Sequence, residues 1–263
     1  KPVNNPSGVV QTEENTLVFV DGNRRFAVLD PGEPADLSSK GNEDLIASPE
    51  GTARAQVGSK HILFVTDMGA VFSAPIEAPD AHLPLNPDAD VEVEEGEAVP
   101  VYLADAAAIT DQDQVVAVRQ ETPEDARIVI VDGATGDTSY DKLVELEVGD
   151  RPQVSLVDGK WVVLNRTDGL LWVEGQADPT SIDPELSPTL RAPGAGDIYV
   201  ADTEGLLVVD PEVQEAKRTV NVPVASKPAQ PTQLQGTVWG AWLTEGETGG
   251  TLWSSETEEA TTL

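Results

Sequence analysis

Carboxylates are the side chains of this protein best suited to chemistry, and they are densest between residues 86 and 100. The segment is NPDADVEVEEGEAVP, in which Asp88, Asp90 and Glu92 occupy every second position. Carboxylate oxygens are hard ligands that Ca²⁺ accepts. The segment departs from the usual calcium-binding loop, because its glycine comes late and valines separate the glutamates. We therefore expect an exposed acidic insertion here, with Asp88, Asp90 and Glu92 as weak calcium candidates.

The two histidines are the other candidates for metal binding or proton transfer. His61 opens the alternating apolar run HILFVT and is expected at the surface of a strand, while His82 lies in a proline-rich loop. A hydrolytic metal centre needs several histidines and carboxylates that converge on one point, and the spacing shows no such set. The chain also lacks a P-loop, a GxGxxG after a strand, a GxSxG and an HExxH. We predict no catalytic residue, no cofactor and no metal beyond the calcium candidates.

The tryptophans are candidate ligand-stacking residues. Trp161 and Trp172 flank one apolar hairpin, and Trp239, Trp242 and Trp253 gather in the last one. Exposed at a rim, such rings would stack on sugars or clamp a peptide. At strand positions they are better explained as core residues packed between sheets, and that is our expectation.

The charge of the chain restricts its partners. Forty-seven Asp and Glu residues against 16 Lys and Arg give a formal net charge of −31. A field of this sign repels nucleic acids and anionic membranes, so we exclude both as partners. Divalent ions, cationic polymers and basic proteins remain, as does a surface that serves solubility alone. The chain has no cysteine, which removes thiol catalysis and cysteine metal sites.

Membrane and targeting signals are absent from the given residues. No apolar run approaches the roughly 20 residues that span a bilayer, so membrane contact is expected only through segments outside this chain. The first residues, KPVNNPSG, lack the apolar centre of a signal peptide. A start without Met is typical of a processed protein, and we expect any leader or anchor outside these residues.

Six similar segments must position these side chains, and each has the pattern of a β-hairpin. In DIYVADTEGLLVVDP, at residues 197–211, two alternating apolar runs flank a polar turn at 203–205. Glycine suits such a turn because tight hairpins require positive φ. Corresponding segments begin at residues 16, 61, 114, 161 and 238. The starting points lie about 37 to 53 residues apart, close to the spacing expected for four-stranded propeller blades.

A weaker strand precedes each hairpin and another follows it. The expected preceding strands are 8–12, 53–57, 106–110, 152–157, 188–193 and 231–235, and the following ones are 35–39, 81–85, 142–148, 180–186, 218–224 and 259–263. We predict an all-β fold that forms a single β-propeller over residues 1–263, with six four-stranded blades and seven as the alternative. The expected blades are 8–40, 53–86, 106–148, 152–186, 188–224 and 231–263. Two β-sandwiches would fit the strand number but not the recurring segment.

The repeats also resemble a known family. DIYVADTEGLLVVDP and WVVLNRTDGLLWVEG, the latter at 161–175, are similar to the repeats of YVTN- and NHL-type β-propellers. With its Asp, Glu, Ala, Val and Thr-rich composition and lack of Cys, the chain resembles the N-terminal propeller region of large actinobacterial surface proteins. Those proteins carry fibronectin type III or immunoglobulin-like modules further along, and no such module is visible in these residues. The resemblance implies an extracytoplasmic scaffold or recognition part of a longer protein.

The sequence thus leaves three functions from different classes. The first is a non-catalytic extracytoplasmic module that binds a protein or carbohydrate, or acts as a scaffold, through the loops between blades. The second is a metal-dependent propeller hydrolase or lactonase, with carboxylates and a histidine converging at one channel mouth. The third is a structural spacer without a ligand.

Overall fold

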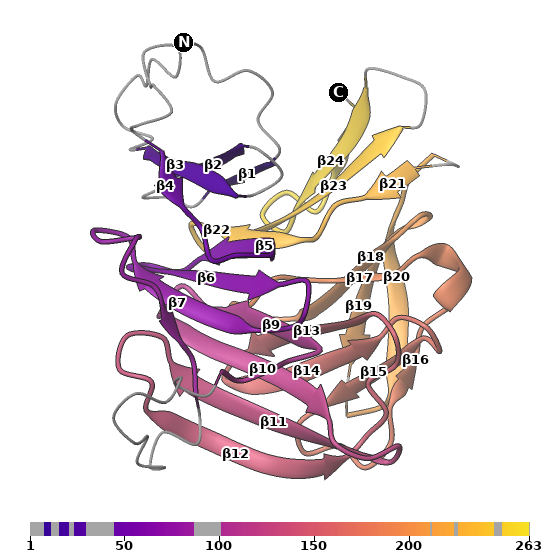
Figure 1. The fold of residues 1–263 in the computed structure, drawn as a ribbon. Helices are drawn as coiled ribbons and strands as arrows, with labels where there is room; N and C mark the ends of the chain where they lie inside the picture. Colours follow the sequence, from indigo (N-terminus) through magenta and orange to yellow (C-terminus); the bar gives the residue numbers. More distant parts are fainter. Residues whose placement is uncertain are drawn as a thin grey trace. The chain divides into compact units, whose positions relative to one another are not determined.

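The computed structural model describes residues 8–11, 16–20, 24–29, 45–86, 101–210, 212–223, 226–244 and 249–262. Within these ranges the regular structure is almost entirely β-strand, and the one helical element is a 3-10 turn at Pro184–Leu186 (Figure 1). The calcium candidates Asp88, Asp90 and Glu92 and the expected strand at 35–39 lie outside the described residues. The prediction of an all-β fold is confirmed.

In the described part of the chain the strands form six sheets, which we number in chain order, and the first three each have four strands. Sheet 1 contains β1 (Gly8–Gln11), β2 (Thr16–Val20), β3 (Arg25–Leu29) and β4 (Ile46–Ala47). Sheet 2 contains β5 (Thr52–Val57), β6 (His61–Thr66), β7 (Val71–Pro75) and β8 (Leu83–Pro84). Sheet 3 contains β9 (Ala106–Ile109), β10 (Gln114–Gln120), β11 (Asp125–Asp132) and β12 (Thr138–Glu145).

Sheets 4 and 5 repeat this arrangement, and sheet 6 has a fifth strand. Sheet 4 contains β13 (Pro152–Val157), β14 (Lys160–Asn165), β15 (Leu170–Val173) and β16 (Thr180–Ser181). Sheet 5 contains β17 (Thr189–Leu190), β18 (Ile198–Asp202), β19 (Gly205–Asp210) and β20 (Glu215–Asn221). Sheet 6 contains β21 (Ser226–Pro228), β22 (Thr232–Leu234), β23 (Thr237–Thr244), β24 (Gly250–Ser254) and β25 (Ala260–Thr262).

The outer strands differ most from the sequence pattern. β16 ends at Ser181, although a strand over 180–186 was expected, because Asp183 caps a 3-10 turn by accepting a hydrogen bond from the Glu185 N–H, and Pro184 favours that turn. β12 ends at Glu145 instead of residue 148. In sheet 6, β21 is an additional strand that pairs with the second half of β23, while β22 pairs with its first half.

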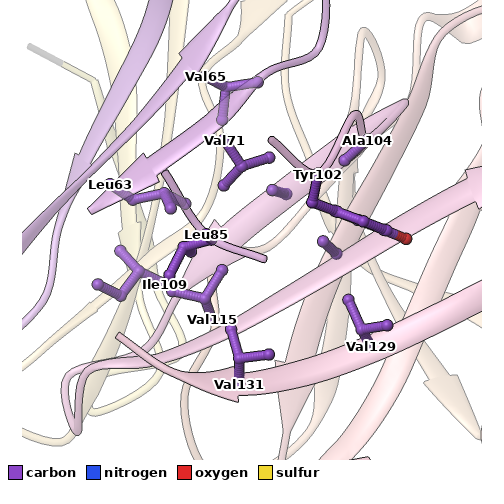
Figure 2. Close-up of a cluster of buried hydrophobic side chains, with 12 residues drawn as sticks. Leu63, Val65, Val71, Leu85, Tyr102, Ala104, Ile109, Val115, Val129 and Val131 are labelled. Atoms are coloured by element: carbon purple, nitrogen blue, oxygen red, sulfur yellow. The ribbon is translucent and has the colours of Figure 1, made fainter. Parts of the chain in front are cut away.

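The chain divides into two compact units, residues 1–117 with 129–142, and residues 118–128 with 143–263. In the first unit, β6 is buried on both faces. Ile62 and Phe64 belong to a cluster with sheet 1, where the rings of Phe26 and Phe64 lie 5.5 Å apart. Leu63 and Val65, at the alternate positions, belong to a cluster with sheet 3. Figure 2 shows this second cluster, in which side chains of β6 and β7 face those of β9 to β11.

The second unit repeats the same use of alternate residues on β18. Ile198 and Val200 pack in a cluster with sheet 4. Tyr199 and Ala201 pack in a cluster with sheet 6. Since successive strand residues point to opposite faces, one short strand contributes to the apolar contact with each neighbouring sheet.

A buried ion pair joins the turn after β18 to the outer strand of sheet 5. Asp202 is 1 % exposed, and its carboxylate accepts two hydrogen bonds from Arg218 at 2.8 and 2.7 Å. The same carboxylate accepts the Glu204 and Gly205 N–H groups, which closes the hairpin turn. The Asp202 carbonyl accepts a hydrogen bond of 2.8 Å from the indole N–H of Trp242 in sheet 6. One residue therefore fixes a turn, a strand and the next sheet.

A second buried charge holds the loop between β17 and β18. Arg191 is fully buried, and its guanidinium donates to the carbonyls of Ala192, Ala195 and Asp197 at 3.1, 3.0 and 2.7 Å. It also donates to Gln233 Oε1 of sheet 6 at 3.1 Å. The loop is wrapped around the cation, and its carbonyl oxygens replace the water that the charge has lost.

Glutamine side chains satisfy free strand edges between successive sheets. β9 and β17 are end strands of sheets 3 and 5, so one edge of each has no strand partner within its sheet. Gln56 of β5 accepts a hydrogen bond from the Ile109 N–H at 3.1 Å, and Gln153 of β13 accepts one from the Leu190 N–H at 2.7 Å. Each pairing removes an unpaired backbone donor and links two sheets.

We predict that Arg218→Met lowers the free energy of unfolding by about 3 kcal/mol, because it leaves the Asp202 carboxylate buried without its cation. Arg119→Met is the matched control, since Arg119 forms a more exposed pair with Glu121 at 3.7 Å, and its loss should cost less than about 1 kcal/mol. Urea unfolding of both variants measures the difference, and equal midpoints would contradict this account of the pair.

A second prediction concerns alkaline pH. Burial, and then Asp197, raise the pKa of Tyr199, whose hydroxyl donates to the Asp197 carboxylate at 3.3 Å. A raised pKa means that folding favours the neutral phenol, so the stabilisation is complete below about pH 10 and is lost as pH rises through the folded-state pKa. Tyr199→Phe should therefore flatten the fall in unfolding free energy above about pH 10.

Candidate functional site

An open cleft lies beside the turn between β6 and β7 in the first unit. Its volume is about 430 Å³, within the range of small-ligand sites. The lining residues are Ala53, Arg54, Val65, Thr66, Asp67, Met68, Gly69, Ala104 and Asp105. They come from three places in the sequence: the start of β5, the β6–β7 turn, and the segment that leads into β9.

The β6–β7 turn is fixed by its own hydrogen bonds. The Thr66 N–H donates to the Ala70 carbonyl, and the Thr66 hydroxyl accepts the Ala70 N–H, both at 2.9 Å. The Gly69 N–H donates to the Thr66 carbonyl, and the Asp67 N–H donates to the Gly51 carbonyl. Asp67 and Met68 therefore stand at the tip of a rigid turn.

The floor of the cleft is a close contact between two backbones. The Ala104 N–H donates to the Gly69 carbonyl at 2.8 Å, and Ala70 forms an antiparallel bridge with Leu103. Gly69 has φ of +83°, and a Cβ at this position would meet the Ala104 carbonyl oxygen at 2.4 Å. Glycine is needed here both for its backbone conformation and for the close approach.

Charged and apolar side chains share the mouth of the cleft. Arg54, Asp67 and Asp105 are exposed. Partial desolvation lowers the pKa of Arg54 from its ordinary value. Met68 is 78 % exposed, and Leu103, beside the floor, is 45 % exposed. Two carboxylates, one guanidinium and a flexible thioether form a surface suited to recognition by charge and by apolar contact.

His61 forms a different polar cluster, at the junction of sheets 2 and 3. The Asp113 carboxylate accepts the Lys60 and His61 N–H groups at 3.0 Å, and His61 Nδ1 lies 3.4 Å from it without hydrogen-bond geometry. The Asp113 carbonyl accepts the Gly133 N–H, and the Gly133 carbonyl accepts the Ser73 hydroxyl. Backbone N–H groups thus occupy the Asp113 carboxylate, and these hydrogen bonds join turns of sheets 2 and 3.

The remaining residues singled out in the sequence do not converge on one site. His82 packs edge-on against Phe72, with ring centroids 6.0 Å apart. Trp161, Trp242 and Trp253 are buried, as expected for core residues, and the other two tryptophans are half-buried. Within the described ranges no three His, Asp or Glu side chains lie close enough together to hold a metal ion. In the same ranges no helix is long and apolar enough to cross a membrane.

The sequence did not point to the cleft residues. Asp67 and Met68 belong to the hairpin turn TDMG, where a polar turn alone was expected. Arg54, inside β5, and Asp105, the residue before β9, carry no local signal, because both are separated from the turn along the chain. The signal available in the sequence was Met68 itself, an apolar residue in a hairpin turn where packing does not require one.

Comparison with known proteins places the fold. No family model and no curated protein matches the chain. Solved structures do: the chain is similar to the β-propeller domain of Myceliophteria thermophila Cps50 (Swd1), with 11% identity, a TM-score of 0.55, and 98% of this chain and 83% of that chain covered. It is also similar to the β-propeller domain of the Trilobed protease from Pyrococcus furiosus, with 11% identity, a TM-score of 0.56, and coverage of 97% and 83%. The Kuenenia stuttgartiensis hydrazine synthase matches with 11% identity, a TM-score of 0.54, and coverage of 98% and 83%.

At these identities the similarity concerns the fold alone. Together with the six sheets of four or five strands in the described residues, it confirms the predicted fold class: the chain has a β-propeller fold.

Gly69→Ala tests the floor of the cleft. We predict that it destabilises the protein by about 3 kcal/mol, since it combines an unfavourable φ, worth about 1 kcal/mol, with a clash against backbone. Gly136→Ala is the matched control: Gly136 has φ of +79°, and a Cβ added there would meet nothing within 4 Å. The control variant should lose only the stability that the unfavourable φ costs, about 1 kcal/mol. Thermal unfolding of the pair measures the difference, and equal loss in both would show that the backbone contact at Ala104 is not tight.

Proposed function

We propose that this protein is a non-catalytic, extracytoplasmic binding or scaffolding module that engages a partner with a basic surface. The observation that carries the proposal is the charge: 47 acidic residues against 16 Lys and Arg, a net charge of −31, on a rigid fold. The extracytoplasmic setting, as part of a longer surface protein, is supported by the resemblance of its repeats to those of actinobacterial surface-protein propellers.

An acidic surface acts on a basic partner before contact is made. Opposite fields steer two proteins together and exclude partners of like charge, and salt screens the effect over about 8 Å at physiological ionic strength. A β-propeller suits this task, because stacked sheets hold the connecting turns in fixed positions. The turn at Asp67 and Met68 is one such position, and its hydrogen bonds hold it ready for contact.

The rival functions have less support. His61 Nδ1 lies 3.4 Å from the Asp113 carboxylate, but the backbone N–H groups of Lys60 and His61 occupy that carboxylate. A carbohydrate partner would be favoured by exposed tryptophans, whereas Trp161, Trp242 and Trp253 are committed to the core. A spacer without a ligand would attract a cationic probe only diffusely and would not bind it saturably, which makes it directly testable.

We expect the protein to bind fluorescein-labelled octalysine saturably, and to show no binding of labelled octaglutamate, because charge selects the partner. Fluorescence anisotropy measures both, and affinity for octalysine should fall at least tenfold between about 0.05 and 0.3 M salt. Absence of octalysine binding at the lower salt concentration would refute a basic partner and leave the spacer. Hydrolysis of lactone substrates by the purified protein would instead support the enzyme.

A further inference from the structure

We propose that the cleft beside the β6–β7 turn is the specific contact site for the partner, and that it accepts a Lys or Arg side chain from an extended basic segment. Asp67 and Asp105 would neutralise the cation, and Met68 would pack on its aliphatic stem. This inference rests on the proposed function and names the site and the chemistry of its ligand.

The shape of the cleft favours a side chain presented on a backbone. Its volume of about 430 Å³ is open to solvent on the side of Asp67, Met68 and Asp105, all of which are exposed. Its floor is rigid, since the Gly69 and Ala104 backbones are joined by a hydrogen bond of 2.8 Å. A preformed floor reduces the entropy that binding would otherwise cost.

The charges of the cleft favour a cation. Asp67 and Asp105 outnumber Arg54 among its charged lining residues, so the local excess has the same sign as the net charge of −31. An anion would be repelled both by the local excess of carboxylates and by the net negative charge of the protein. An uncharged apolar ligand would remove water from charged side chains without supplying a countercharge, which is unfavourable.

The apolar part of the mouth favours Lys and Arg over a bare metal ion or small amine. Met68 is 78 % exposed and belongs to the same turn as Asp67. Lys and Arg carry a long apolar stem behind their charge, and a flexible thioether adapts to such a stem. Asp67 therefore suits the charged end of a Lys or Arg side chain, and Met68 suits its apolar stem.

Arg54 restricts what enters. It is the single cation among the described residues of the lining, and it opposes a second positive charge close to the first. Segments in which basic residues are spaced apart are thus favoured over dense runs of them, since an unfavourable contact is as selective as a favourable one.

The test compares the intact protein with two double variants of equal charge. Asp67→Asn with Asp105→Asn removes both carboxylates of the cleft. Glu212→Gln with Glu215→Gln removes two exposed carboxylates of sheet 5. Glu212 lies in the turn between β19 and β20, and Glu215 is the first residue of β20. Anisotropy is measured with labelled octalysine and with a labelled peptide of alternating Lys and Gly. We expect the cleft variant to bind both peptides about tenfold more weakly, and the control variant to change affinity less than about twofold.

Two single variants separate the roles within the cleft. Met68→Ser should weaken binding about threefold, and Met68→Leu should retain it, because the stem contact requires apolar area. Arg54→Gln should strengthen binding of octalysine more than that of the alternating peptide. Circular dichroism melting of each variant checks that the fold is intact.

The outcomes separate this inference from the function on which it rests. Equal weakening of the two double variants would mean that charge acts diffusely, which overturns the cleft as the site and leaves the basic partner in place. Failure of the unmodified protein to bind either peptide would overturn both. Selective loss in the cleft variant supports both.

Discussion

The structure depends on one physical constraint, which is that its sheets are apolar on both faces. In β6, Ile62 and Phe64 pack toward sheet 1, while Leu63 and Val65 pack toward sheet 3. Such a strand has no face suited to water, so a sheet built from it is stable only between neighbours. Burial of both faces explains why the same hairpin recurs within each unit: sheet 2 supplies apolar surface to sheets 1 and 3, and sheet 5 supplies it to sheets 4 and 6.

Apolar packing alone would not fix how successive sheets are aligned, because it has little directionality. The directional contacts are polar and few. Asp202 binds Arg218 within sheet 5 and accepts the Trp242 indole N–H from sheet 6, and Arg191 donates to Gln233 of sheet 6. Losing one partner of a buried ion pair is costly, since the other charge is then left unpaired away from water. We infer that these contacts set the alignment of sheets 5 and 6, while the apolar clusters provide most of the stability.

The sequence predicts the hairpins well because their signals are local. Alternation identifies both strands, and Gly205 marks a turn where a side chain would collide with the Val220 carbonyl. The outer strands are poorly predicted, since β16 and β21 have two or three residues and depend on pairing with a neighbour. The cleft could not be predicted at all: Arg54, Asp67 and Asp105 meet because the backbones at Gly69 and Ala104 approach closely, and no periodicity in the sequence reports that approach.

Packing and recognition make different demands on the β6–β7 turn. The fold requires Gly69, whose conformation and close contact exclude a side chain, but nothing in the core requires an exposed thioether at Met68. Long-range attraction by the whole acidic surface weakens as salt shortens the screening length to below about 10 Å, whereas contacts within the cleft act over about 4 Å. Added salt should therefore lower total affinity for a basic segment while raising the share of binding that occurs in the cleft. Under the proposed function, a partner bound at physiological ionic strength would be selected by Asp67, Met68 and Asp105 more than by the net charge.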